Sequence, residues 1–94
     1  MLKGKQRSML KSIANTLRPT VIIGKQGATE NVVKQIDEQL TANEIVKINL
    51  LDTSGLDADV LIHELMEILN AEFVSQLGSK LVLYRESENH IIEL

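Results

Sequence analysis

Apolar side chains recur along the chain at two spacings, and the changes between these spacings predict the order of helices and strands. Residues 4 to 17 carry apolar residues every three to four positions, which predicts an amphipathic helix. Pro19 disfavours helical geometry at the residue before it, so this helix should end there. The predicted inward stripe consists of Met9, Leu10, Ile13, Ala14 and Leu17.

The same helical spacing occurs twice more. One helix should run from about Thr29, a suitable N-cap, to Leu40, and another from the cap Asp57 to about Asn70. The expected inward side chains of the earlier helix are Val32, Val33, Ile36 and Leu40. Those of the later helix are Val60, Leu61, Leu65, Ile68 and Leu69.

Short strands take up the remaining apolar stretches. Residues 20 to 23 should form a short strand that is buried, or nearly buried, on both faces. Residues 45 to 51 should form a strand whose side chains point alternately to the two faces of the sheet. Residues 73 to 77 and 80 to 85 flank a turn at Gly78 and Ser79, which predicts a hairpin. Residues 88 to 94 add at most a short extended piece. On the alternating strand, Val46, Ile48 and Leu50 should face one way, and Ile45, Lys47 and Asn49 the other.

The resulting order, α-β-α-β-α-β-β, predicts an α/β sandwich with a small mixed sheet of four strands and right-handed crossovers. The 94 residues make a single domain, with its core at about residues 2 to 85 and a short C-terminal tail. Phe73 and Tyr84 are the only aromatic residues, so the core must be aliphatic.

Composition excludes several kinds of chemistry. The chain has no cysteine, which removes disulfides, thiolate catalysis and cysteine-based metal sites. Its basic N-terminal segment lacks the apolar run of a secretory signal, and no stretch is long enough to span a bilayer. We therefore expect a cytoplasmic protein that stays out of membranes, and nothing in the pattern requires more than a monomer.

Charge is distributed unevenly along the chain. Residues 1 to 35 carry seven basic residues and one acidic residue, whereas residues 36 to 94 carry three basic residues and twelve acidic ones. This asymmetry favours a polyanion-binding end. The alternative, in which each sign of charge only keeps one helix face in solvent, stays open at this point. The basic positions near the start are Lys3, Lys5, Arg7, Lys11 and Arg18.

The sequence GKQG at residues 24 to 27 joins a predicted strand to a predicted helix. Backbone N–H groups at a helix N-terminus favour an anion, glycine lets a phosphate backbone approach closely, and Lys25 adds a charge at the tip of the loop. KH domains clamp nucleic-acid backbones with this Gly-x-x-Gly pattern. The alternative is a plain tight turn. The loop residues are Gly24, Lys25, Gln26 and Gly27.

The last predicted strand offers further candidate contacts. Lys80 and Tyr84 should share one face, with Arg85 following, and an exposed Tyr84 would stack on a base. Lys47 is a further phosphate contact if it lies on an open face of the sheet. The competing interpretations are a half-buried Tyr84 that closes the sheet and a Lys47 that is merely exposed to solvent.

An enzyme, a nucleotide cofactor and a metal site are not expected. The loop lacks the third glycine of the dinucleotide fingerprint and the lysine–hydroxyl pair of a P-loop. The sequence HELME at residues 63 to 67 is not a zinc motif, because Glu67 replaces the second histidine. No serine–histidine–aspartate arrangement stands near a glycine elbow either.

Taken together, these segments resemble a known family. The run LRPTVIIG at residues 17 to 24, Gly27, EIVKINL at 44 to 50 and GSKLVLYR at 78 to 85 are similar to YhbY-type proteins. These are the bacterial stand-alone form of the CRM domain, named for chloroplast RNA splicing and ribosome maturation. The resemblance implies a fold like the C-terminal domain of translation initiation factor three. It also implies RNA binding through the Gly-x-x-Gly loop, and association with precursors of the large ribosomal subunit during ribosome assembly.

Two other functions remain as alternatives. The acidic segment 57 to 72 would suit a protein-interaction module for basic partners, ribosomal proteins included. A duplex-binding architectural protein is the other nucleic-acid alternative. Charge reversal at Glu64, Glu67 and Glu72 would separate the protein-binding alternative from RNA binding.

Overall fold

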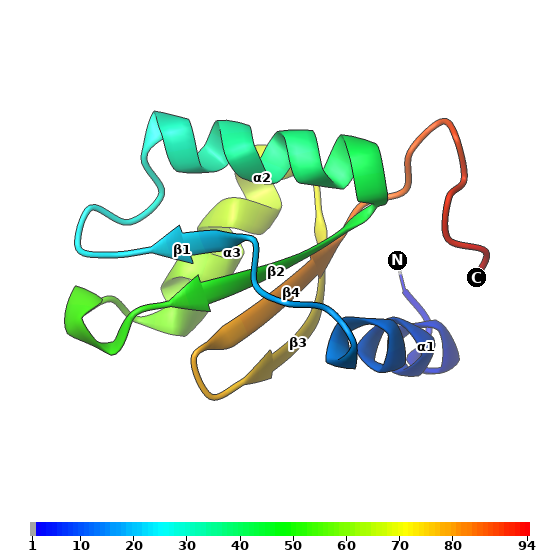
Figure 1. Cartoon of the computed structure of the whole chain (residues 1–94), viewed down its shortest axis with the longest axis horizontal. Coiled ribbons are helices and arrows are strands. Elements are labelled where there is room, and N and C mark those ends of the chain that lie inside the picture. The colour runs from blue at the N-terminus through cyan, green and yellow to red at the C-terminus, as the bar shows by residue number, and fades with distance from the viewer. Residues whose placement is uncertain (1) are drawn as a thin grey trace.

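The computed structural model describes residues 2–94, and the predicted α/β order is confirmed (Figure 1). The strands form one mixed sheet in the order β1-β2-β4-β3, in which β1 and β2 are parallel and the other pairs are antiparallel. The elements are α1 (Gly4–Asn15), β1 (Val21–Ile23), α2 (Glu30–Asn43), β2 (Ile45–Leu50), the 3-10 turn η1 (Asp52–Ser54), α3 (Ala58–Leu69), β3 (Glu72–Leu77) and β4 (Lys80–Tyr84).

Helices cover the two faces of the sheet unequally. Helices α2 and α3 pack on one face against Val46, Ile48 and Leu50, and the larger core lies there. Helix α1 packs on the other face, where Leu10 and Ala14 meet Ile45, Val82 and Tyr84. The predicted two-sided alternation of β2 is therefore confirmed, and the second face is covered by a single helix.

Helix boundaries follow local chemistry. The Thr29 hydroxyl accepts a hydrogen bond from Val32 N at 3.2 Å, and Asp57 accepts from Asp59 N at 2.9 Å, so both predicted N-caps are confirmed. Helix α2 continues past Leu40 to Asn43. It ends there because Glu44 adopts a left-handed conformation, with φ 68°, and its N–H bonds to Leu40 O.

Several burial predictions were wrong, for different reasons. Ile22 is 61% exposed because β1 is an edge strand whose α1-side face has no cover there. Met9 is 47% exposed, since the short α1 meets the sheet along a narrower seam than its apolar stripe. Val60 and Ile68 also lie outward, and Ile62 takes the inner position on α3. The tail after β4 adds no strand, although Ile92 packs on the smaller core.

Candidate nucleic-acid interface

The Gly24–Gly27 loop leaves the end of β1 and leads into α2 (Figure 1). Its N–H at Gly27 donates to Gly24 O at 3.0 Å, so the segment is a tight turn, and Lys25 and Gln26 are exposed at its tip. Gly27 has φ +67°, and a Cβ there would lie 3.4 Å from Leu56 Cδ1. Gly27 is thus required by the fold itself.

Gly24 differs from Gly27 in this respect. Its φ lies outside the left-handed region, and a Cβ there would make an ordinary 3.8 Å contact with Leu51 Cδ1. Nothing in the fold of residues 2–94 therefore demands glycine at position 24. Close approach of an external ligand is a reason for a glycine there that the fold does not supply.

The basic residues of the first part of the chain carry unneutralised charge. Lys3, Lys5, Lys11, Arg18 and Lys25 are exposed. Within residues 2–94, ion pairs join Arg85 to Asp37 and His90 to Glu86, and none involves these five cations. Arg7 is half-buried, and its Nε donates to Phe73 O on the edge strand β3 at 3.3 Å. The N-terminal charge excess is therefore available to an anion.

Helix α1 and the glycine loop lie at opposite ends of the molecule, although they are close in sequence (Figure 1). The longest dimension of the structure is 35 Å, and the strand β1 runs between the two sites. A ligand that uses both must therefore pass over the sheet.

Lys47 and Lys80 both lie on the α1 side of the sheet. Lys47 Nζ donates to Ala14 O at 3.1 Å and Leu17 O at 3.2 Å, so it satisfies carbonyls at the end of α1. Lys80 Nζ donates to Asn49 Oδ1 at 3.1 Å. An ammonium group has three donors, so each lysine keeps at least one N–H beyond these contacts.

Tyr84 is buried rather than exposed. Only 4% of its surface is accessible, because α1 and the C-terminal tail cover it, so the ring cannot stack on a base. Burial raises the pKa of the Tyr84 phenol above its ordinary value of 10.0, and the nearby carboxylates of Glu44, Glu86 and Glu72 add to this shift. Of the two interpretations left open by the sequence, the structure supports a residue that closes the sheet.

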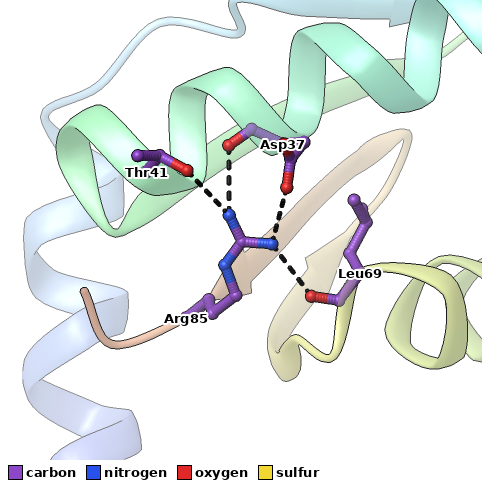
Figure 2. A network of polar contacts seen from close by, with 4 residues as sticks. All are labelled: Asp37, Thr41, Leu69 and Arg85. Carbon is purple, nitrogen blue, oxygen red and sulfur yellow. Dashed lines mark hydrogen bonds and ion pairs between the residues drawn. The ribbon is translucent and has the colours of Figure 1, made fainter. Parts of the chain in front are cut away.

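Arg85 is also a structural residue (Figure 2). Its guanidinium donates to Asp37 Oδ1 at 2.9 Å, Leu69 O at 3.0 Å, Thr41 Oγ1 at 3.0 Å and Asp37 O at 3.1 Å. These bonds join β4 to α2 and to the end of α3. The prediction that Arg85 is an RNA contact conflicts with this arrangement, because both of its Nη atoms already have partners inside the protein.

Glu44 is a residue that sequence reasoning missed. Its side chain is fully buried, and its carboxylate accepts hydrogen bonds from Ser87 N at 2.6 Å and Ile92 N at 2.5 Å, which fixes the C-terminal tail. Burial alone would raise the pKa of Glu44. The backbone hydrogen bonds from Ser87 and Ile92 and the nearby His90 outweigh that effect, and the pKa is lowered from its ordinary value of 4.5. No sequence signal marks this role, since Glu44 stands beside a helix end like many exposed acids.

The residues of the HELME segment form no metal site. His63 Nδ1 lies 2.7 Å from Asp59 O, a contact within α3. Among residues 2–94 no group of three histidine, cysteine or acidic side chains is arranged to hold a metal ion. Within the same range, no helix combines the length and apolar character needed to cross a membrane.

Fold and site together define a small α/β domain with a Gly-x-x-Gly turn whose tip is exposed and with exposed, unneutralised basic residues near its start. A model of the CRS1/YhbY (CRM) domain matches residues 2–85. The chain belongs to this family, as its sequence segments indicated. The family is non-enzymatic, which agrees with the expectation that the chain is not an enzyme.

Individual relatives cover the whole chain. "Probable RNA-binding protein YqeI" of Bacillus subtilis (strain 168) is 39% identical over 95 residues, which span 100% of this chain and 99% of the relative. An "RNA-binding protein" of Haemophilus influenzae is 33% identical over 93 residues, and this alignment covers 99% of this chain and 94% of the relative. Among solved structures, the chain is similar to the solution structure of SAV1595 from Staphylococcus aureus, which is described as a candidate RNA-binding protein. The two sequences are 43% identical. The TM-score is 0.83, with 100% of this chain and 99% of that chain covered, which supports the fold.

Proposed function

We propose that this protein binds RNA without catalysing a reaction, and that it does so in precursor particles of the large ribosomal subunit, where it assists assembly. The observation that carries the proposal is the set of exposed cations in residues 3 to 25 that make no ion pair within residues 2–94. Membership in the CRM family and the RNA-binding names of its relatives support the same ligand class.

In the proposed mechanism, the cations of α1 dock on phosphates and the loop Gly24–Gly27 clamps the RNA backbone. Lys25 reaches a phosphate from the exposed tip of the loop, and Gly24 allows the backbone to come close. Such binding releases counterions, so the affinity falls steeply with salt. Arg7, Lys11 and Arg18 contribute on the helix side, with Lys3 and Lys5 at its start.

The first test is a salt-titrated binding assay with structured fragments of large-subunit ribosomal RNA. We compare the wild type with the triple variant Lys25→Glu, Arg7→Glu, Lys11→Glu, using circular dichroism to verify folding. Lys34→Glu is the matched control, because Lys34 is an exposed lysine on α2 outside the proposed interface. The triple variant should lose affinity and salt dependence, and the control should keep most of both. Equal binding by the folded triple variant and the wild type refutes the interface.

The ribosomal part of the proposal needs a separate measurement. Tagged protein in cell extracts is fractionated on a sucrose gradient, and its distribution is compared with those of precursor and mature large subunits. We expect wild type to sediment with the precursor and the triple variant to remain at the top. Co-sedimentation with mature subunits alone would exclude a role in assembly while leaving RNA binding intact.

A second candidate function is protein binding by the outward side of α3. Val60 is 63% exposed and Ile68 is 53% exposed, and the exposed acids Glu64 and Glu67 lie on the same helix. An apolar and acidic surface of this kind suits a basic protein, and ribosomal proteins are basic. Glu72 does not belong to it, since Glu72 lies on β3 and accepts from Leu2 N. The double variant Glu64→Lys, Glu67→Lys should lose such a partner and keep RNA affinity.

A further inference from the structure

A groove of about 250 Å³ lies between α1 and the part of the sheet that α1 leaves uncovered. Nine residues line it, and none of them is acidic. Six of the nine are polar or cationic: Lys11, Asn15, Lys47, Ser75, Gln76 and Lys80. Three lysines with no carboxylate among them create a local positive potential that favours an anion.

Beside this groove, four residues on neighbouring strands form a single row across the sheet. Ile22 on β1 is opposite Asn49 on β2, Asn49 is opposite Lys80 on β4, and Lys80 is opposite Leu77 on β3. With neighbouring strands about 4.8 Å apart, the row spans roughly 14 Å. Its two ends are apolar and strongly exposed, with Ile22 at 61% and Leu77 at 78%, and its middle is polar.

The groove and the row lie between the two proposed RNA-binding regions. Lys11 belongs to α1, whereas Ile22 precedes Gly24 by two residues on β1. Lys47 is opposite Val82 on β4, one row nearer to α1 than Lys80. A ligand held by Lys11, Lys47 and Lys80 would therefore extend along the sheet from α1 toward the glycine loop.

We propose that this groove and the row from Ile22 to Leu77 form a further binding surface for single-stranded RNA. One RNA strand would run over this surface from the glycine loop to α1. This inference rests on the proposed function. The Lys11 ammonium group, which makes no hydrogen bond or ion pair with residues 2–94, and the remaining N–H groups of Lys47 and Lys80 hold phosphates. Ile22 and Leu77 pack on sugars and unpaired bases.

The chemistry of the row favours an unpaired strand over a duplex. Apolar side chains reach base faces only where the bases are unstacked and turned outward, as in single-stranded RNA. The face has no exposed aromatic ring, since Tyr84 is buried, so bases would pack on aliphatic side chains, which do not read base edges. The site should therefore tolerate many sequences and respond strongly to salt.

The test uses the full chain and two labelled probes, an unstructured oligouridylate and an RNA duplex of the same length. The lysine variants are Lys11→Gln and Lys80→Gln, each compared with Lys34→Gln on α2 as the matched control. Lys47 is left in place because it holds the end of α1. The apolar variant is Ile22→Thr with Leu77→Thr, both at exposed positions whose replacement leaves the core intact.

The two kinds of variant should leave different signatures with oligouridylate. Each lysine variant should reduce the slope of log affinity against log salt by about 0.7, the value for one phosphate of a single strand. The apolar variant should bind roughly threefold to tenfold more weakly at every salt concentration, with an unchanged slope. Binding of the duplex should respond less to either change.

Three results would overturn the inference. If Lys25→Glu weakens binding but Lys11→Gln and Lys80→Gln behave as Lys34→Gln does, RNA binding stands and the groove is not a site. If the duplex binds as tightly as oligouridylate and responds equally to all variants, the occupant is not a single strand. If the wild type binds neither these probes nor ribosomal RNA fragments, the proposed function itself fails, and the inference fails with it.

Discussion

Arg85 and Asp37 form an ion pair, with Nη1 2.9 Å from Oδ1, that joins the end of β4 to the middle of α2 (Figure 2). The same guanidinium bonds to Leu69 O at the end of α3, so three elements meet at one side chain. Ion pairing thus separates the basic residues of this chain by role. Arg85 supports the fold, whereas the exposed cations between Lys3 and Lys25 are available to a ligand.

Replacing Arg85 with glutamine should therefore affect stability and not RNA affinity. The substitution removes the ion pair and leaves Leu69 O and Asp37 without charged donors, which we expect to cost about 1 to 3 kcal/mol in the free energy of unfolding. Urea denaturation measures this loss. Arg18→Gln is the matched control, because Arg18 is exposed and should show the reverse pattern of normal stability and weaker RNA binding. Weaker RNA binding by folded Arg85→Gln would contradict the structural role.

Alanine at the two glycines of the loop should have opposite effects. Gly24→Ala adds a Cβ at an ordinary contact distance, 3.8 Å from Leu51 Cδ1, so stability should stay near wild type while RNA affinity falls. Gly27→Ala places alanine at φ +67° and should lower the free energy of unfolding by about 1 to 2 kcal/mol. Thermal unfolding and RNA titration on both variants check this. Unchanged affinity in Gly24→Ala would mean that no ligand approaches position 24 closely.

The buried carboxylate of Glu44 should make stability depend on acid pH. Its pKa is lowered in the folded protein, so the stabilisation is fully present above the ordinary value of 4.5 and is lost as the pH falls through the lower folded pKa. Glu44→Ala leaves the N–H groups of Ser87 and Ile92 without this acceptor and should cost about 2 kcal/mol at neutral pH. Denaturation at neutral and acid pH should show a smaller pH dependence in the variant. An identical dependence in both proteins would assign the acid sensitivity elsewhere.

Tyr84 should behave as a core residue in two independent measurements. Tyr84→Phe should bind RNA like wild type, whereas Tyr84→Ala should lose about 3 kcal/mol of stability, as expected for truncation of a buried aromatic side chain. Because the chain has one tyrosine, ultraviolet absorbance can follow its ionisation directly. The phenol should ionise above pH 10.0, and stability should decline as the pH rises through that pKa. Ionisation at or below 10.0 would contradict the burial.

Local patterns were sufficient to propose the glycine loop and the exposed basic residues as candidate contacts. The basic residues from Lys3 to Arg18 and the sequence GKQG could be singled out because charge and glycine spacing are properties of neighbouring residues. The roles of Tyr84 and Arg85 could not, because they depend on which elements pack beside β4. Tyr84 is covered by α1 and the tail, and Arg85 meets Asp37, a residue 48 positions earlier in the chain.

The sequence by itself determined the order of helices and strands, the caps at Thr29 and Asp57, and the concentration of positive charge before residue 35. These features depend on periodicity, local hydrogen bonding and composition. Only the tertiary structure decided which apolar side chains are buried. Helix α1 covers one part of its sheet face, so Ile22 and Leu77 remain exposed at the two ends of the row that contains Asn49 and Lys80. The tertiary structure also brought Lys11, Lys47 and Lys80 into one groove, because strand register and helix packing join residues that are distant in sequence.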